Sequence, residues 1–333
     1  MSAVLSGLCR SLPAVIASRR PPAGGRLSFP AGSGLPVVRF ASAGGLCRLA
    51  RRGSWDVINL HFSGWPRPWL LGLEKALASS GARLVVTFQD FEHPELPRGT
   101  AAQRTALRRL LRRADTVTAV SAHLRDRVEA SLPGLRGKVL VVPNGVGLPA
   151  PRAGRRPPAR RPYILSVGRL APYKGTDLLL MAYSQLKDPK ADLVLCGAPF
   201  HEDHARGLIA ALRLEGRVHL TGLQSPARVA ALLEGCLFYA AAPRTETFGM
   251  AVVEAMAAGK AVLAARVGAI PEYLRDGKEG LLAEPKDVAG LRRGLERLLG
   301  DAALRRRLGA GARRAARRFS WDRVAGRYLD VYR

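Results

Sequence analysis

The chain has 333 residues, which is long enough for two domains that each bury a hydrophobic core. Hydrophobic residues make up 47% of the chain, yet no apolar run reaches the length of a membrane-spanning helix, so the composition argues against an integral membrane protein. The four cysteines are scattered without a C-x-x-C pair, which indicates reduced core residues of a cytosolic protein and neither a disulfide framework nor a zinc site.

The first 54 residues contain two candidate strands of the first domain. The apolar runs at 14–18 and 35–40 (AVIAS and LPVVRF) have the length of strands, and residues 2–12 could be the end of a helix. Glycines occur at 21–26 (PPAGGR), but Pro30 would interrupt a helix that followed them. This region therefore lacks a clear succession of strand, glycine-rich loop and long helix.

Strands and helices then alternate up to a linker. Strands are expected at 56–62, 83–88, 116–121 and 138–142, and helices at 69–80, 100–113 and 122–132. This alternation predicts a parallel sheet with helices on its faces. The linker at 148–162 (LPAPRAGRRPPARRP) is rich in Pro, Arg and Gly and has no apolar periodicity.

The second half repeats the pattern. At least five more strand–helix units follow the linker, and the chain ends in helical stretches at 287–300, 302–318 and 321–333. Two α/β domains are therefore expected, one over residues 1–150 and one over residues 151–333.

A basic loop follows the first strand of the second half. The predicted strand Tyr163–Val167 leads into GRLAPYKG and then into a helix. Gly168 permits a tight turn, and Arg169 and Lys174 place two positive charges beside the carboxyl end of the strand. An arginine can bind a phosphate bidentately and a lysine acts as a compact charge, although in so basic a chain solvated loop charges are the alternative.

Two glutamates flank the start of a predicted helix at 250–258. Glu246 lies in the preceding loop and Glu254 two turns away within the helix, and this E-x7-E spacing directs both carboxylates toward one helix N-terminus. The free N–H groups and the helix dipole at that end favour a phosphate. Carboxylates beside a phosphate site would bind hydroxyl groups, so a nucleotide-sugar fits the pair. The spacing alone is common, and two surface carboxylates are the alternative.

The segment 242–285 resembles the donor site of the retaining family 4 glycosyltransferases (glycosyl transferases group 1). The motifs P-R-x-E-x-F-G, EAMAAGK and G-x-I-P-E carry this resemblance, together with GRLAPYKG upstream. DVINLHF, VVTFQD, ADTVTAVSAHL and VVPNGV in the first half are also similar to the family, and the terminal FSWDRVAGRYLDVYR resembles the helix that crosses back to the first domain. The resemblance covers about residues 55–333 and implies the GT-B fold: two Rossmann-like domains with parallel sheets facing a central cleft.

The resemblance also implies roles for the residues around the second glutamate motif. Glu246 would contact the hydroxyls of the donor sugar, and Glu254 would contact the ribose of the nucleotide. Backbone amides would lie against the sugar and phosphate at Phe248, Gly249 and Met250.

The basic loop would hold the leaving group. By the same resemblance Arg169 and Lys174, next to Gly168, bind the donor diphosphate and stabilise it as it leaves. The implied reaction is a retaining transfer of a hexosyl group from a UDP- or GDP-linked sugar to a glycan or lipid-linked acceptor, without a metal ion or other cofactor. The leaving phosphate would accept the proton of the acceptor.

Two features depart from the family pattern on the acceptor side. Members usually begin with a strand, a Gly-rich loop and a long helix, so we expect that this first βα unit is missing from residues 1–54. Where many members have a histidine in T-x-H, this chain has Gln89, which can donate and accept hydrogen bonds but cannot titrate. His61, at the end of a predicted strand, could contact the acceptor or equally be a hydrogen-bonded structural histidine.

The formal net charge of +27 has one organised component. Arg104, Arg108 and Arg112 recur every four residues on the predicted helix 100–113, with leucines on the other face. Such a face suits peripheral contact with an anionic membrane on its cytoplasmic side, although a solvated face explains the pattern equally well. Residues 1–55 carry eight arginines and no acid, as transit peptides do, but their apolar runs fit strands.

Two other functional classes stay open. A non-catalytic nucleotide-sugar-binding protein with a degenerate acceptor domain would keep the donor motifs. A nucleic-acid-binding protein would explain the charge, but the arginines are dispersed without a recognition motif, so no specific nucleic acid partner is expected. HEDH at 201–204 resembles metal ligands, yet it opens a helix where capping acids are expected and lacks a further ligand cluster.

Overall fold

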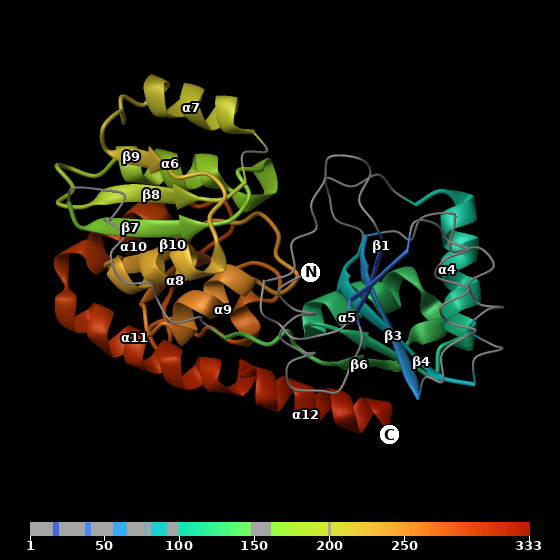
Figure 1. Ribbon diagram of the computed structural model, residues 1–333. Coiled ribbons are helices and arrows are strands. Elements are labelled where there is room, and N and C mark those ends of the chain that lie inside the picture. The colour runs from blue at the N-terminus through green and yellow to red at the C-terminus, as the bar shows by residue number, and fades with distance from the viewer. Residues whose placement is uncertain are drawn as a thin grey trace. The chain divides into compact units, whose positions relative to one another are not determined.

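The computed structural model describes residues 56–64, 77, 81–91, 99–147, 161–198 and 201–333, together with the backbone of 16–19 and 37–40. The chain divides into two compact units (Figure 1), one comprising Met1–Gly145 with Ser320–Arg333 and the other Val146–Phe319. Each unit is an α/β structure with a parallel sheet, as the sequence predicts. No helix among the described residues is long and apolar enough to cross a membrane.

The main sheet of the first unit has four parallel strands in the order β3-β4-β5-β6. Their bounds are Val57–Ser63 for β3, Arg83–Asp90 for β4, Thr116–Ala119 for β5 and Val139–Val141 for β6. Strand β4 is buried from Leu84 to Phe88, because helices and loops cover both faces of a parallel sheet. All four predicted strands are confirmed, with small shifts at their ends.

The two predicted strands near the N-terminus are also present. β1 (Ile16–Arg19) and β2 (Val37–Phe40) pair with each other in parallel, and they form a two-stranded sheet of their own. Both candidate strands are thus confirmed as strands, in a sheet separate from β3-β4-β5-β6. The predictions for residues 2–12 and 21–26, and all of 69–80 except helical Leu77, lie outside the described residues.

Local capping explains where the helices of the first unit begin. α4 (Ala101–Arg113) starts with a capping box, in which Thr100 Oγ1 accepts from the Gln103 amide and Gln103 Oε1 accepts from the Thr100 amide. α5 (Ala122–Ser131) starts at Ser121, whose side chain accepts from the Leu124 amide at 3.0 Å. A short 3-10 helix, η2 (Pro133–Leu135), connects α5 to β6.

The C-terminal helix α12 (Trp321–Tyr332) belongs to the first unit. Its buried residues Val324, Ala325, Tyr328 and Val331 share one apolar cluster with Val85 of β4 and with Val142. Gly145 lies so close to the Trp321 ring that a Cβ at this position would overlap the ring. The apolar face of this amphipathic helix thus covers part of the first sheet.

The second unit contains six parallel strands in the order β12-β11-β10-β7-β8-β9. Their bounds are Tyr163–Val167 for β7, Asp192–Cys196 for β8, Val218–Leu220 for β9, Phe238–Ala241 for β10, Val262–Ala265 for β11 and Leu281–Ala283 for β12. From β7 the chain runs outward through β8 and β9, and it then returns to start β10 on the other side of β7. The order therefore reverses between β7 and β10, where doubly wound sheets bind ligands at the carboxyl ends of their strands.

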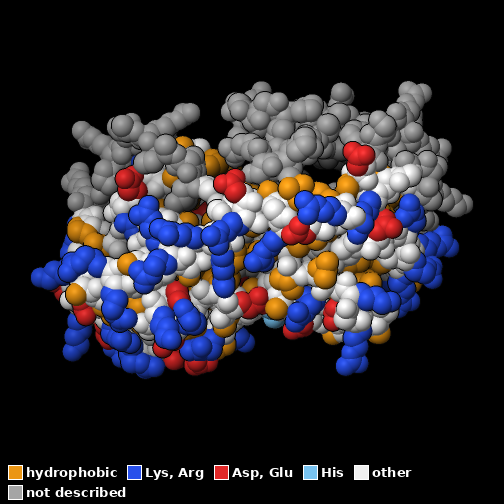
Figure 2. Space-filling view, turned by 90° about the horizontal axis from the view of Figure 1, so that it is seen from below, with side chains coloured by type: hydrophobic (Ala, Val, Ile, Leu, Met, Phe, Trp, Pro, Cys, Tyr) orange, Lys and Arg blue, Asp and Glu red, His pale blue; other side chains and the backbone are white. Residues whose placement is uncertain are grey.

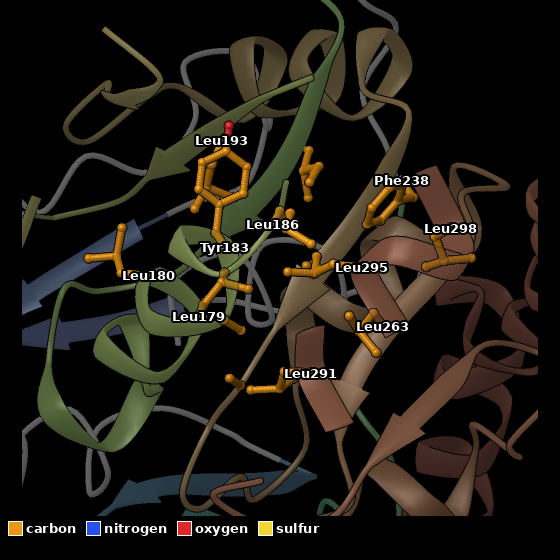
Figure 3. Packing of buried hydrophobic residues seen from close by; sticks show 14 of the residues in the cluster. Leu179, Leu180, Tyr183, Leu186, Leu193, Phe238, Leu263, Leu291, Leu295 and Leu298 are labelled. Carbon is orange, nitrogen blue, oxygen red and sulfur yellow. The ribbon is translucent and has the colours of Figure 1, made fainter. Parts of the chain in front are cut away.

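Helices cover both faces of this sheet. Their bounds are Thr176–Ser184 for α6, Glu202–Ala211 for α7, Pro226–Gly235 for α8, Met250–Ala257 for α9, Val288–Gly300 for α10 and Ala302–Ala316 for α11. α6, α7 and α10 share a large apolar cluster with alternate strand residues such as Leu193, Phe238 and Leu263 (Figure 3). α8 and α9 contact β7, β10 and β11 but contribute no residue to that cluster, so they lie on the opposite face.

Candidate functional site

Two loops meet where the strand order reverses. The loop after β7 begins at Gly168, and Gly197 lies so close to it that a Cβ at position 197 would overlap the Gly168 carbonyl oxygen. The same loop ends in the 3-10 helix η3 (Pro172–Lys174) and at Gly175, which has a left-handed φ of 63°. A Cβ at Gly175 would overlap the carbonyl oxygen of Ala242, which follows β10. Glycine at 175 thus permits direct contact between the two loops.

Arg244 ties these loops together. Its amide donates to the Tyr173 carbonyl at 2.7 Å, and its guanidinium donates to both carboxylate oxygens of Asp177 at 2.8 and 2.6 Å. Burial works against ionisation of Asp177, but the hydrogen bonds and charge of Arg244 outweigh it, so the pKa of Asp177 is lowered. Sequence reasoning missed this residue, although it lies within the P-R-x-E motif.

The predicted basic and acidic residues of the donor site come together. Lys174 Nζ lies 2.6 Å from Glu246 Oε2, and the exposed fractions of these side chains are 26% and 14%. The Tyr173 ring lies beside both cations, with its centroid 5.2 Å from Lys174 Nζ and 5.4 Å from Arg169 Cζ. Arg169, Lys174 and Glu246 therefore form one cluster at the carboxyl ends of β7 and β10.

Helix α9 begins beside this cluster at a glycine. Gly249 is the N-cap with φ 87°, and having no side chain it cannot accept a hydrogen bond from the first turn. Tyr273 Oη donates to the Phe248 carbonyl at 2.6 Å and would be overlapped by a Cβ at Gly249. The backbone N–H groups that begin at Met250 have no partner within the helix, so this end of α9 suits an anion.

The G-x-I-P-E segment holds the backbone of the catalytic candidate Glu246. The Ala269 amide donates to the Glu246 carbonyl at 3.0 Å. Gly268, with φ 53°, lies so close that a Cβ there would overlap the same oxygen. This contact explains why the motif contains a glycine, which the sequence pattern did not reveal.

Glu254 differs from Glu246 in its surroundings. It lies within α9 and is largely buried, and burial raises the pKa of its carboxyl group to about 7. Among the described residues, no side chain forms an ion pair with Glu254. A polar ligand that donates hydrogen bonds to the Glu254 carboxylate would therefore stabilise its buried negative charge.

The acceptor-side candidates of the first unit form a hydrogen-bonded chain. Gln89 Nε2 lies 3.1 Å from His61 Nδ1, and Asn144 Nδ2 donates to Gln89 Oε1 at 2.9 Å. Burial lowers the pKa of His61 to about 4, so its imidazole is neutral at pH 7. With the Gln89 amide nitrogen facing Nδ1, the histidine proton is assigned to Nε2. Sequence reasoning missed Asn144, which belongs to the VVPNGV motif.

Nothing in the described part of the chain gathers three His, Cys, Asp or Glu side chains as a metal site would require. His201 and His204 lie at the start of α7, as predicted from HEDH, and Glu202 there pairs with Arg206 one turn away. Cys196 and Cys236 are buried free thiols, while Cys9 and Cys47 lie outside the described residues.

Comparison with known proteins agrees with this architecture. Residues 8–148 match the model of Glycosyltransferase Family 4, and residues 151–315 match that of Glycosyl transferases group 1. A D-inositol 3-phosphate glycosyltransferase of Salinispora tropica is 38% identical over 186 residues, which are 53% of this chain and only 39% of that protein. The Acidothermus cellulolyticus protein of the same name is 31% identical over 332 residues, which are 90% of this chain and 72% of that protein.

The fold has close structural counterparts. The crystal structure of Anabaena Alr3699/HepE in complex with UDP-glucose superposes with a TM-score of 0.82 at 20% identity, covering 99% of this chain and 94% of that one. At this identity the likeness concerns the fold alone. Because the family models match consecutive halves and the Acidothermus relative matches most of the chain, the protein belongs to the glycosyl transferases group 1, the family 4 glycosyltransferases of GT-B fold.

Proposed function

We propose that this protein is a retaining glycosyltransferase that moves a hexosyl group from a nucleotide-diphosphate sugar to a glycan or lipid-linked acceptor. The observation that carries the proposal is the Lys174–Glu246 pair beside the N-terminus of α9. A cation and free amide groups suit the diphosphate, and an adjacent carboxylate suits sugar hydroxyls. Few other ligands combine both chemistries.

In the proposed reaction the protein stabilises the leaving diphosphate. Arg169 and Lys174 supply positive charge, and the amides near Gly249 supply the positive end of α9. The Lys174 ammonium has three donors, so it can keep Glu246 as a partner and still bind a phosphate oxygen. Glu246 would then orient the sugar, and Glu254 would accept hydrogen bonds from the ribose.

No protein base is assigned on the acceptor side. Gln89 cannot take up a proton, and the Nδ1 of neutral His61 faces the Gln89 amide. We infer that the leaving phosphate accepts the proton of the acceptor hydroxyl on the face from which it departs. The His61–Gln89–Asn144 chain would position the acceptor through hydrogen bonds.

The nucleotide of the donor and the identity of the acceptor are proposals drawn from relatives. The Anabaena structures contain UDP or UDP-glucose, which favours UDP as the nucleotide. The relatives in Salinispora and Acidothermus are named D-inositol 3-phosphate glycosyltransferases, so a phosphorylated inositol is a second acceptor candidate beside a glycan or lipid.

The proposed location is the cytoplasmic face of an anionic membrane, where lipid-linked acceptors of the cell envelope are found. The support is α4, on which Arg104, Arg108 and Arg112 are exposed while Leu107 and Leu110 are buried. Exposed arginines on one helix face are attracted to anionic lipid headgroups.

A thermal-shift screen with UDP-, GDP- and ADP-sugars tests the donor proposal, because a ligand that binds only the folded state raises its stability. We expect a UDP-sugar to raise the melting temperature of the wild-type protein more than that of the Lys174→Ala variant at the same ligand concentration. Incubation of that sugar with glycan, lipid-linked and inositol phosphate acceptors then tests turnover. Stabilisation by a donor without transfer to any acceptor would favour the non-catalytic alternative.

A further inference from the structure

The second unit contains a basic pocket that the donor loops do not form. The turn 275–280 and helix α11 line an open pocket of about 520 Å³. Its lining includes Arg275, Lys278, Glu279, Arg307, Gly311 and Arg314. Four cations and one acid thus face the same space. On the face seen in Figure 2, Lys and Arg side chains are far more numerous than Asp and Glu.

Helix α11 contributes two arginines separated by a glycine. Arg307, Gly311 and Arg314 follow one another at four and three residues, so they lie on one face of the helix. A Cβ at Gly311 would overlap the Lys278 carbonyl oxygen. The glycine therefore lets the turn contact the helix between the two arginines. This contact brings Lys278 of the turn close to Arg307 and Arg314 of the helix.

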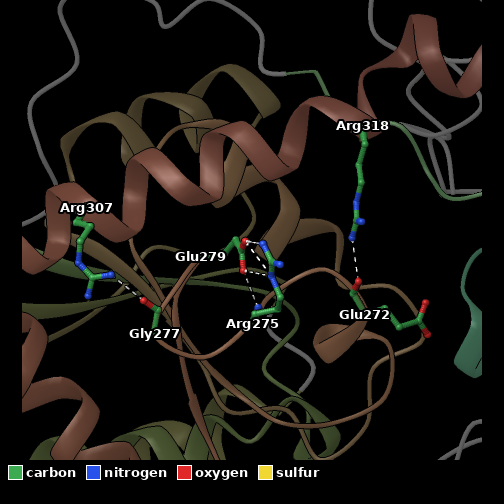
Figure 4. Close-up of polar contacts among 6 residues, drawn as sticks. All are labelled: Glu272, Arg275, Gly277, Glu279, Arg307 and Arg318. Atoms are coloured by element: carbon green, nitrogen blue, oxygen red, sulfur yellow. Dashed lines mark hydrogen bonds and ion pairs between the residues drawn. The ribbon is translucent and has the colours of Figure 1, made fainter.

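Hydrogen bonds within the turn and to α11 give the turn a defined conformation. Gly277 has φ 71°, and its amide donates to the Gly280 carbonyl at 2.8 Å. Arg307 Nη1 donates to the Gly277 carbonyl at 2.8 Å (Figure 4), and Asp276 Oδ1 accepts from the Leu282 amide at 2.8 Å. Because these contacts fix the backbone, little ordering is required when the pocket is filled.

Only one of the four cations is neutralised by the pocket itself. Glu279 accepts from Arg275 Nε at 3.0 and 3.1 Å and from the Arg275 amide at 3.0 Å (Figure 4). These hydrogen bonds lower the pKa of Glu279, which keeps its charge and compensates Arg275. Among the described residues, none of the other three cations, Lys278, Arg307 and Arg314, has an acidic partner.

We propose that this pocket binds a ligand that carries two or more phosphate groups. Three uncompensated cations around one concave site favour a clustered anion over a single charge, and arginine and lysine are the side chains that bind phosphate most strongly. Clustered phosphates occur in soluble polyphosphates and in lipid headgroups with two phosphodiester groups, such as that of cardiolipin. The proposal does not depend on the assignment of the donor site.

Calorimetric titration with tripolyphosphate tests the pocket directly. Because the donor loops could also hold this probe, all titrations use the Lys174→Ala background. We expect Lys278→Gln combined with Arg314→Gln to weaken binding by roughly a hundredfold, about tenfold for each charge-assisted contact. The matched control, Arg297→Gln with Arg306→Gln, removes two exposed arginines that do not line the pocket and should change affinity less than about twofold.

Vesicles identify the source of the phosphates. Phosphatidylcholine vesicles with and without cardiolipin are sedimented with the same variants. If the pocket variant loses binding to cardiolipin vesicles and the control variant does not, the phosphates belong to a lipid headgroup. If the pocket variant loses only tripolyphosphate binding and still sediments with cardiolipin vesicles, the ligand is soluble. Equal weakening in the pocket and control variants for both probes, or no binding of either probe by the parent protein, would overturn the proposal.

Discussion

At the scale of single residues, substitutions at Lys174 and at Glu246 should distinguish binding of the diphosphate from binding of the donor sugar. Lys174→Ala and Arg169→Ala should each weaken UDP binding by about 1.5–3 kcal/mol, roughly ten- to a hundredfold, because a charge-assisted contact to the diphosphate is lost. Glu246→Ala should leave UDP affinity unchanged or slightly higher, since free UDP has no sugar and Lys174 loses its competing partner. Affinity for the intact UDP-sugar should fall instead.

Calorimetry with UDP and with its sugar conjugate measures this contrast. Lys190→Ala is the matched control, because Lys190 is an exposed lysine of the same unit outside the two loops. If the Lys174, Arg169 and Glu246 variants bind both ligands as the wild type does, the site assignment is wrong.

Glu254 should make the stability of the protein depend on pH. Its pKa is raised by burial to about 7 in the folded state, so the folded state binds more protons than the unfolded state between the two pKa values. Stability from this group is therefore present at low pH and lost as pH rises through 7. Urea denaturation of wild type and Glu254→Gln at pH 5 and pH 8 should show that the variant gains up to about 2 kcal/mol relative to wild type at the higher pH. If the free energy of unfolding differs between the variant and the wild type by the same amount at both pH values, Glu254 is not buried without a partner.

At the scale of elements, the strands and helices could be predicted from apolar periodicity, but the contacts between loops could not. The runs Tyr163–Val167 and Met250–Ala257 are readable because strand and helix repeats differ and glycine ends the helix. The Arg244–Asp177 bridge joins residues that are 67 positions apart. Only the parallel pairing of β7 with β10 brings these residues together, and a pattern within one segment carries no such information.

The proposed donor residues could be selected from the sequence by spacing and resemblance, whereas the residues of the basic pocket could not. Arg307 and Arg314 are two arginines among many in a chain with 53 basic residues. Their significance depends on the turn at 275–280, and sequence alone does not show that α11 contacts this turn at Gly311.

The contact between the two donor loops predicts the effect of a single methyl group. Gly175→Ala should lower the free energy of unfolding by more than about 1 kcal/mol, because the left-handed φ is unfavourable and the new Cβ would overlap the Ala242 carbonyl. The loops should also separate, so UDP affinity should fall. Gly207→Ala in α7 is the control: no atom lies within 4 Å of the added Cβ, and alanine should stabilise the helix by about 0.5–1 kcal/mol. Equal stability of the two variants, measured by urea denaturation, would refute the close contact.

At the scale of the whole molecule, the net charge of +27 alone predicts attraction to any polyanion, so a specific membrane surface requires a comparison at constant charge. The exposed arginines of α4 provide it. Replacement of Arg104, Arg108 and Arg112 by Gln should reduce binding to phosphatidylglycerol vesicles, and each arginine is worth about 1 kcal/mol near an anionic surface. Binding of the wild type should weaken as salt rises, because the attraction is screened.

The control removes the same charge from the second unit. Arg297, Arg306 and Arg317 are exposed residues of that unit, and their replacement by Gln lowers the net charge as much as the α4 triple variant does. If α4 is the membrane-binding face, vesicle sedimentation should fall for the α4 variant and stay near the wild-type level for the control. Equal sedimentation of both triple variants would mean that the total charge, and not the face of α4, attracts the protein to anionic lipid.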